Sequence, residues 1–369
     1  MEPLAPHEKL FVDSEIVEDE NHGELGCDEC HGGNSAEPDW RKAHEGVVKD
    51  PSYPDASETC GSCHEEIAEN YKTSLHNTLS PFKKMVAMRA NSDKHVHAKV
   101  DAAREGHCTS CHSSCGQCHI SRPESVGGGL LEGHLFQKRP PMQTVCTACH
   151  GSRIGKEYLG ENEGFKPDVH KEKYFKCNKC HTADEMHGSG QECANRYDVK
   201  NGPKCADCHN AIYDAKAENA KNHWIHKDQV SCNVCHSQQY KNCYSCHVGK
   251  DKNGSEFFKT AGSPLGFKIG LNPLKSKERP ESFVTVRHIP VDKDTFKYYA
   301  KNGLANFDKL PNWKLTTPHN IRRQTPQNKT CNSCHGNDKL FLQKKDVTKS
   351  DLKANKDVIV PLEIIPKKR

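Results

Sequence analysis

Pairs of cysteines separated by two residues recur along this 369-residue chain, and a histidine follows each of them. The densest example is the stretch CTSCHSSCGQCH, from Cys108 to His119. Three chemistries use a Cys-x-x-Cys pair: a redox disulfide, half of a zinc site, and the two thioether bonds of a c-type haem. Only the haem requires His as the next residue, because that residue lies beneath the iron and becomes its proximal ligand.

The following histidine is present in all ten pairs, which we number as motifs 1 to 10 in chain order. With 24 His in 369 residues, a His at any one position has a frequency of about 0.07. Neither zinc sites nor disulfides impose this neighbour. The expected thioether anchors are Cys27, Cys30, Cys60, Cys63, Cys108, Cys111, Cys115, Cys118, Cys146, Cys149, Cys177, Cys180, Cys205, Cys208, Cys232, Cys235, Cys243, Cys246, Cys331 and Cys334. The expected proximal iron ligands are His31, His64, His112, His119, His150, His181, His209, His236, His247 and His335.

This pattern resembles the multihaem c-type cytochromes, here with ten motifs, and the match spans Cys27 to His335. The resemblance implies ten covalent haem c groups and a periplasmic or extracellular location, because thioether attachment takes place outside the cytoplasm. The similar electron-transfer cytochromes of metal-reducing prokaryotes have other redox proteins or extracellular electron acceptors as partners, and some of them polymerise. Cys193 is the one cysteine outside the motifs.

The sixth coordination position of each iron decides between carrying electrons and binding a substrate. Fourteen histidines lie outside the motifs, more than the ten needed, whereas five methionines are too few. We therefore expect mostly bis-His haems. The expected distal ligands are His44, His76, His107, His134, His170, His187, His223, His226, His288 and His319. The other four, His7, His22, His95 and His97, lie in charged segments and are interpreted as surface residues or substitutes, of which one can cap a haem in a neighbouring copy.

Closed irons carry electrons and make no bond in a substrate. We therefore expect electron transfer in anaerobic or extracellular respiration, at the low potentials typical of ligation without Met, and we assign no catalytic residue. The alternative is a multihaem oxidoreductase of the hydroxylamine, tetrathionate or nitrogen-oxide type with one open haem. Ammonia-forming nitrite reductases replace a motif His by Lys, and none of these ten motifs does so.

The elements that position these residues must be short. The hydrophobic fraction is 34% and the mean hydropathy is −0.88, too little for several large apolar cores. The expected fold is mostly irregular, with short α-helices wrapped around a covalent haem array and little β structure. We expect helices around Ile67 to Leu75 and from Ser80 to Met88, and a shared helix face for His223 and His226. The runs ESFVTVRHIPV and VIVPLEIIP are predicted as strands.

Motif spacing divides the chain into five regions. We expect an acidic N-terminal tail at 1–24, haems 1 to 4 at 25–125 and haems 5 to 9 at 126–247. A haem-free lobe or arm follows at 248–330, and haem 10 with a C-terminal tail at 331–369. Since Cys115 follows Cys108 by only seven residues, haems 3 and 4 are predicted to be neighbours.

The formal charge is +4, but each bis-His haem with ionised propionates adds about −1 when ferric and about −2 when ferrous. The haem-loaded protein would therefore carry roughly −6 or −16, and nucleic acid is excluded as a partner. No apolar run reaches the roughly 18 residues of a membrane span. The resemblance implies an exported chain, and because the N-terminus lacks a signal-like apolar region, we expect that the signal peptide is absent from this numbering. The oppositely charged ends, DSEIVEDE and PKKR, are interpreted first as two solvated tails; the alternative hypothesis is that they join copies of the chain in a homo-polymer or homo-oligomer.

Overall fold

The computed structural model describes residues 4–108, 113–123, 126–260 and 262–369. The chain divides into two compact units. Unit 1 consists of Met1–Lys83, Cys108–Gly151 and Lys176–Gly202, and unit 2 consists of Lys84–His107, Ser152–Phe175 and Pro203–Arg369. Motifs 1 to 6 therefore belong to unit 1 and motifs 7 to 10 to unit 2.

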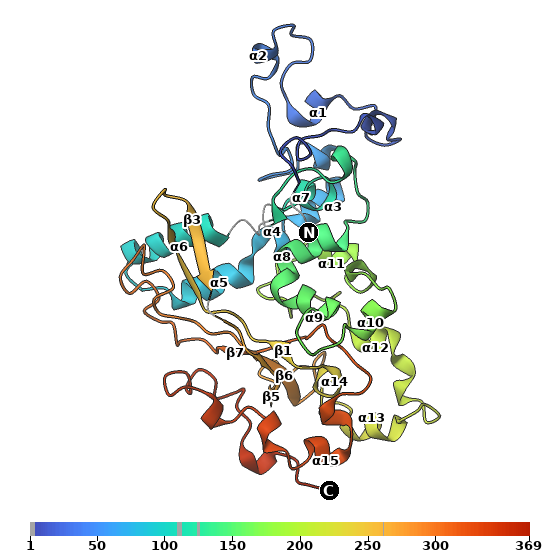
Figure 1. The fold of residues 1–369 in the computed structure, drawn as a ribbon, viewed down its shortest axis with the longest axis vertical. Helices are drawn as coiled ribbons and strands as arrows, with labels where there is room; N and C mark the ends of the chain where they lie inside the picture. Colours follow the sequence, from blue (N-terminus) through green and yellow to red (C-terminus); the bar gives the residue numbers. More distant parts are fainter. Residues whose placement is uncertain (1–3, 109–112, 124–125, 261) are drawn as a thin grey trace. The chain divides into compact units, whose positions relative to one another are not determined.

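Short helices dominate both units (Figure 1). The α-helices are α1 (Cys27–His31), α2 (Trp40–Ala43), α3 (Glu65–Tyr71), α4 (Leu75–Thr78), α5 (Ser80–Arg89), α6 (Lys94–Cys108), α7 (Cys115–His119), α8 (Thr147–His150), α9 (Lys156–Leu159), α10 (Val169–Glu172), α11 (Ala183–His187), α12 (Cys205–Cys208), α13 (Ala220–His226), α14 (Cys232–His236) and α15 (Cys331–Cys334). Shorter 3-10 and π turns include η1 (Ser14–Glu18), η2 (Cys60–Ser62), η5 (Glu132–His134), η6 (Met142–Cys146), η7 (Gly151–Gly155), η8 (Cys177–Lys179), η9 (Asn210–Tyr213), η10 (Pro326–Asn328), η11 (Asp338–Leu340), η12 (Lys344–Asp346) and η13 (Leu362–Ile364).

The strands all lie in unit 2 as far as the described residues extend. They are β1 (Tyr240–Lys241), β2 (Cys246–Lys250), β3 (Glu256–Thr260), β4 (Leu265–Gly266), β5 (Lys268–Leu271), β6 (Phe283–His288) and β7 (Trp313–Leu315). They form three small antiparallel sheets, β1-β4, β2-β3 and β5-β6-β7. The expectation of short helices, irregular structure and little β structure is confirmed.

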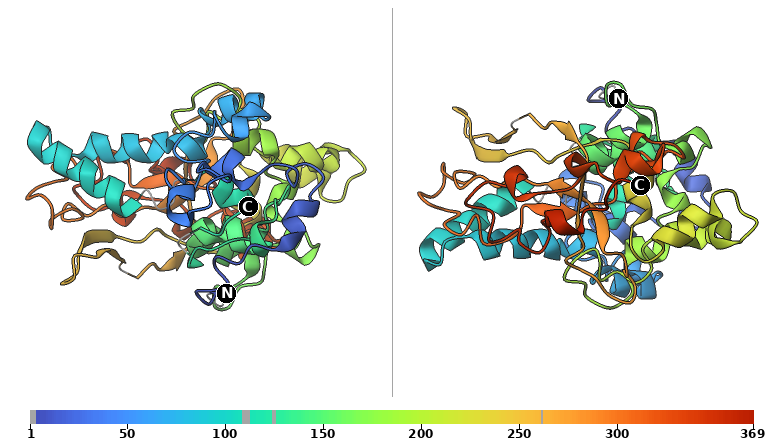
Figure 2. Two further views of the ribbon diagram at one scale, coloured as in Figure 1. Left: turned by 90° about the horizontal axis from the view of Figure 1, so that it is seen from above. Right: turned by 90° about the horizontal axis from the view of Figure 1, so that it is seen from below.

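Unit 2 has apolar cores made of side chains. One cluster packs Val284 and Val286 of β6 against Leu342 and Val358, and a second packs Phe341 and Ile269 together. A third lies around Val100 of α6, which runs beside α5 (Figure 2). Composition alone led us to expect no such cores, because it does not show that the apolar residues are concentrated in one part of the chain.

Unit 1 differs from unit 2 because its described buried apolar residues are few and mostly small. They are Ala56, Ala68, Leu131 and Val145. Such residues contribute little to the hydrophobic free energy of folding, since this scales with the apolar area that is buried.

The local predictions met different outcomes. Helix α5 begins at Ser80 as predicted, and FVTVRH forms strand β6 between β5 and β7. The predicted stripe from Ile67 to Leu75 lies on two helices, because Ser74 caps α4 by accepting the backbone N–H of His76 at 3.2 Å. The strand predicted for VIVPLEIIP is wrong: Val358, Ile359, Val360 and Ile365 are buried and residues 361–364 are exposed, and the run joins no sheet. The N–H of Leu271 nevertheless donates to the carbonyl of Val358 at 2.9 Å. Within the described ranges, every helix is too short or too polar to cross a bilayer.

Candidate metal centres

Seven motif histidines lie opposite a histidine from outside the motifs. Each of these pairs has its two ring centres 6.0–6.4 Å apart. With the motif residue first, the pairs are His31 with His134, His64 with His22, His119 with His187, His150 with His76, His209 with His170, His236 with His223, and His335 with His226. No histidine occurs in two pairs.

This separation fits one metal ion between two imidazoles. Metal–imidazole bonds are about 2.0–2.1 Å long and a ring nitrogen lies about 1.1 Å from its ring centre, so two rings on opposite sides of one ion have centres about 6.2–6.4 Å apart. The observed range of 6.0–6.4 Å overlaps this value. The donor set therefore fits a bis-His haem iron in seven of the ten motifs.

Hydrogen bonds at Nδ1 orient many of these rings. The Nδ1 of His31 lies 2.7 Å from the carbonyl oxygen of Val48, and that of His119 lies 2.7 Å from the carbonyl oxygen of Gln137. The Nδ1 of His226 has the same relation, at 2.7 Å, to the carbonyl of Asn222. A histidine that donates from Nδ1 keeps the Nε2 lone pair available for a metal, as metal-ligating histidines usually do.

Carboxylates perform the same task for two other rings. Asp168 caps α10 by accepting the backbone N–H of His170 at 2.8 Å, and the same oxygen lies 2.8 Å from the Nδ1 of that residue. Glu185 of α11 lies 2.9 Å from the Nδ1 of His181. The Nδ1 atoms of His134 and His223 are instead buried with no acceptor among the described residues.

Burial keeps several rings in the form that binds metal. Desolvation lowers the pKa of His76, His134, His187 and His236 below the ordinary value of histidine. A neutral imidazole is the ligating form, so binding a metal at these rings requires no deprotonation near neutral pH.

Helical turns position the three side chains of most motifs together. Residues i, i+3 and i+4 lie on one face of a helix, so both cysteines and the histidine of a motif project from the same side. Motifs 1, 4 and 8 occupy α1, α7 and α14 from the first Cys to the His. Motifs 2, 5, 6, 7 and 10 begin or end on similar turns. In motif 3, residues 109–112 lie outside the described residues, and with them Cys111 and His112.

Cysteine contacts give an order to the motifs of unit 1. A hydrogen bond from Cys115 of motif 4 lowers the pKa of Cys60 of motif 2 to about 6. A hydrogen bond from Cys177 of motif 6 likewise lowers the pKa of Cys146 of motif 5 to about 7. Burial, and then the charge of Cys146, raises the pKa of Cys118 of motif 4 to about 11. Hydrogen bonds therefore link motif 2 to motif 4 and motif 5 to motif 6, and the influence of Cys146 on Cys118 shows that motifs 4 and 5 are near each other.

Unit 2 links motifs 7, 8 and 10 in the same way. A hydrogen bond from Cys205 lowers the pKa of Cys232 to about 7. Burial, and then the charge of Cys334, raises the pKa of Cys235. Helix α13 lies beside α14 and α15 (Figure 1) and supplies the second ring to both motif 8 and motif 10, through His223 and His226. Motifs 8 and 10, which are separated in the sequence by motif 9, thus share one helix that carries the second ring of each.

Four predicted distal ligands, His44, His107, His288 and His319, do not belong to the seven ring pairs. His44 ends α2, with its Nδ1 2.6 Å from the carbonyl of Trp40, and His288 stacks on Trp313 with ring centres 5.0 Å apart. His107 has its Nε2 2.6 Å from the hydroxyl of Tyr299. The Nδ1 of His319 lies 2.9 Å from the carbonyl of Thr317, so its orientation resembles that of the paired rings.

Sequence reasoning missed His22, which lies opposite His64 and stacks on Phe136 with ring centres 4.0 Å apart. Its acidic surroundings indicated a surface position. The signal that could have identified it is Asp19, three residues earlier, whose carboxylate accepts the backbone N–H of His22 at 2.8 Å and orders the turn. The Nε2 of His97, treated as a surface residue, faces Asp101 at 3.4 Å.

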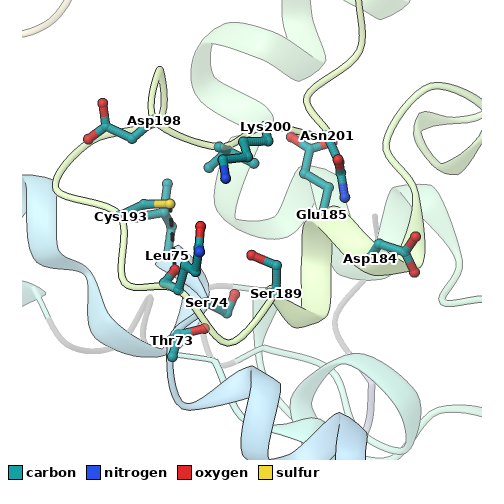
Figure 3. Close-up of a pocket in the computed structure, with 13 residues that line it drawn as sticks. Thr73, Ser74, Leu75, Asp184, Glu185, Ser189, Cys193, Asp198, Lys200 and Asn201 are labelled. Carbon is teal, nitrogen blue, oxygen red and sulfur yellow. Dashed lines mark hydrogen bonds between the residues drawn. The ribbon is translucent and has the colours of Figure 1, made fainter.

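Cys193 lines a cavity of about 260 Å³ in unit 1 (Figure 3). The walls are residues 73–75 and the segment 184–201. The thiol lies 3.7 Å from the carbonyl oxygen of Gln191, and burial is the main cause that raises its pKa. These contacts are those of a protonated thiol within a loop.

Comparison of the chain with family models, with curated proteins and with solved structures found no match.

Proposed function

We propose that this protein attaches ten c-type haems covalently and conducts electrons along them. The observation that carries this proposal is the set of seven motif and non-motif histidine pairs, with ring centres 6.0–6.4 Å apart. A histidine of each pair directly follows a Cys-x-x-Cys sequence, so attachment and ligation coincide. The bound haems would supply one-electron iron redox chemistry.

The protein's own residues set how such a chain works. The two histidines of each ring pair would hold an iron from both sides, so such an iron would have no position left for a substrate. The sulfur contacts between motifs 2 and 4, 5 and 6, and 7 and 8 support close approach of the attached groups, because each thioether sulfur is bonded to the edge of its porphyrin. All-imidazole ligation favours low potentials, as anaerobic or extracellular respiration requires. The partners would be other redox proteins or extracellular acceptors.

Haem counting and spectroscopy test this proposal. The protein should be produced in a host that exports and matures c-type cytochromes, and its mass should exceed the apo-protein mass by ten haems. The pyridine haemochrome assay should give the same number. Low-temperature EPR of the oxidised protein should be dominated by low-spin bis-His signals. A protein without covalent haem, or one whose haems are mostly high-spin, would contradict the proposal.

A polymeric form is a second candidate, supported by what each end of the chain exposes. Leu10 and Val17 are 73% and 70% exposed within the acidic N-terminal segment, and Leu362 is 62% exposed beside the basic residues 367–369. Apolar groups flanked by opposite charges suit head-to-tail contact between two copies. Electron microscopy of the native haem-loaded protein should reveal filaments, and particles of single-copy size at all concentrations would refute them.

A further inference from the structure

Motif 9, Cys243–His247, differs from the other described motifs in its backbone. Its last two residues begin strand β2, whereas the other motifs outside residues 109–112 lie on helical turns. Successive side chains of a strand point to opposite sides, so Cys246 and His247 are not arranged as they are on a helix. The ring of His247 is therefore oriented differently, relative to the cysteines of its motif, from the histidines of motifs that lie on helical turns.

His247 also differs in what faces its ring. In the described part of the chain, no second imidazole comes into ring contact with it. Its Nε2 instead faces the carboxylate oxygen Oδ2 of Asp292 at 3.4 Å, and the two side chains are 43% and 38% exposed. Nε2 is the nitrogen that the Nδ1 hydrogen bonds of His31 and His119 leave available for a metal. An oxygen donor thus occupies the place that an imidazole occupies in seven other motifs.

Rigid neighbours hold this arrangement. The other carboxylate oxygen of Asp292 accepts the backbone N–H of Asp294 at 2.8 Å. The N–H of Val248, next to His247, donates to the carbonyl of Thr295 at 3.0 Å. Val248 and Phe296 are buried in the same apolar cluster of unit 2. Both partners are therefore fixed by residues that pack into a core.

Two predicted distal ligands of unit 2 have their rings engaged elsewhere. His288 is adjacent to motif 9, since its carbonyl accepts the N–H of Cys243 at 2.8 Å, but its ring stacks on Trp313. His107 has its Nε2 bound to the hydroxyl of Tyr299.

A positive charge lies at the attachment edge of the same motif. The Nη1 of Arg153 is 2.9 Å from the Sγ of Cys243. Since reduction lowers the charge of a haem by one unit, a nearby guanidinium favours the reduced state. The reduction potential of a haem at this motif would therefore be higher than that of a haem without a neighbouring positive charge.

We propose that the haem of motif 9 has Asp292 rather than a histidine on its distal side, and that it binds small exogenous ligands. The inference rests on the proposed haem attachment and deepens it by giving one site of the chain a second role. A carboxylate accepts hydrogen bonds and repels anions, so the ligands that fit are neutral molecules with an N–H or O–H donor. A neutral N–H donor such as imidazole would therefore be preferred over an anion at this site.

Carbon monoxide binding to the reduced, haem-loaded protein tests the site. The wild-type protein should bind carbon monoxide, with its stoichiometry measured by difference spectroscopy. Asp292→His supplies an imidazole and should lower the stoichiometry by one equivalent, whereas Asp292→Asn should leave it unchanged. The double substitution Cys243→Ser/Cys246→Ser should yield nine haems by mass and the same loss of one equivalent, and it provides the test if Asp292→His does not fold.

The ligand class is tested on the oxidised protein with imidazole and azide as probes. Imidazole should convert a high-spin EPR signal to low spin at lower concentration than azide does. Asp292→Asn removes the repelling charge and should improve azide binding about tenfold relative to imidazole. An unchanged ratio would overturn the assignment of ligand class.

The outcomes separate the two proposals. If the protein carries ten haems but binds no carbon monoxide, or if its stoichiometry is the same in all these variants, the inference about motif 9 is wrong and the conductor stands. If mass and pyridine haemochrome show no covalent haem, the proposed function itself fails.

Discussion

Helix α13 allows the proposed ligation to be tested at single-residue precision. His223 and His226 lie three residues apart on this helix, opposite His236 and His335. His223→Ala should therefore open one haem and His226→Ala another. Each change should convert about one tenth of the low-spin haem to high spin and add one equivalent of carbon monoxide binding, because one of ten irons loses a ligand. The double variant should add two equivalents.

The geometry of helix α13 predicts that the imidazole must be at residue 223 itself to ligate the iron. Moving the imidazole by one residue, in His223→Ala/Asn222→His, rotates it by about 100° around an axis from which side chains reach about 6 Å. The ring is thereby displaced by about 9 Å, far more than a coordination bond tolerates. Asn222 is exposed, so the new histidine should be accommodated without restoring the low-spin signal.

A background that lacks haem 10 assigns each ligand to its motif. In Cys331→Ser/Cys334→Ser, the effect of His226→Ala should disappear while that of His223→Ala remains, since effects of substitutions on one centre are not additive. His97→Ala is the matched control, because its ring faces Asp101 and it should change nothing. Unchanged carbon monoxide binding in His223→Ala, or rescue by Asn222→His, would refute the assignment of ligands from ring pairs.

The remaining predictions concern one further ligand and two stabilising contacts. His22→Ala should open the haem of motif 2 and add one equivalent of carbon monoxide binding, whereas His7→Ala should not; equal effects would contradict the pairing. Glu157→Ala should lower the free energy of unfolding by about 3–5 kcal/mol in chemical denaturation, because it leaves Arg287 buried and unpaired, and Glu157→Gln should cost less. Leu342→Ala should cost about 2–5 kcal/mol with the haem number unchanged, since Leu342 is fully buried among apolar side chains; a loss below 1 kcal/mol would show that this core contributes little to stability.

The Cys-x-x-Cys-His motifs can be recognised in the sequence because each is a local pattern. If each motif holds one porphyrin, a helical turn would bring its two sulfurs and its imidazole to one side within five residues. The shared helix face of His223 and His226 was also predictable, since residues three positions apart lie on the same side of a helix. The sequence likewise predicted α5 from Ser80 and a strand within ESFVTVRHIPV.

The partner of each ring was not predictable, because it depends on contacts between distant segments. His76 lies opposite His150 and His31 opposite His134, separations that no local pattern encodes. His22 was misjudged because acidic neighbours usually indicate solvent, although here Asp19 orders the turn that presents the ring. The C-terminal VIVPLEIIP was misjudged because an apolar run shows that a segment is buried without showing whether it joins a sheet.

The distribution of apolar side chains indicates that the two units obtain their stability differently. Val286, Leu342 and Val358 of unit 2 are almost fully buried, and such packing stabilises a fold without any cofactor. In unit 1 the described buried apolar residues are few, so side-chain packing contributes less to its stability than it does in unit 2. If porphyrins supply the remaining packing, loss of haem should unfold unit 1 while β5, β6 and β7 of unit 2 remain protected. The four motifs of unit 2 would then be attached to a core that exists independently of them, and the proposed motif 9 site, whose last two residues begin strand β2, would depend on that core for its geometry.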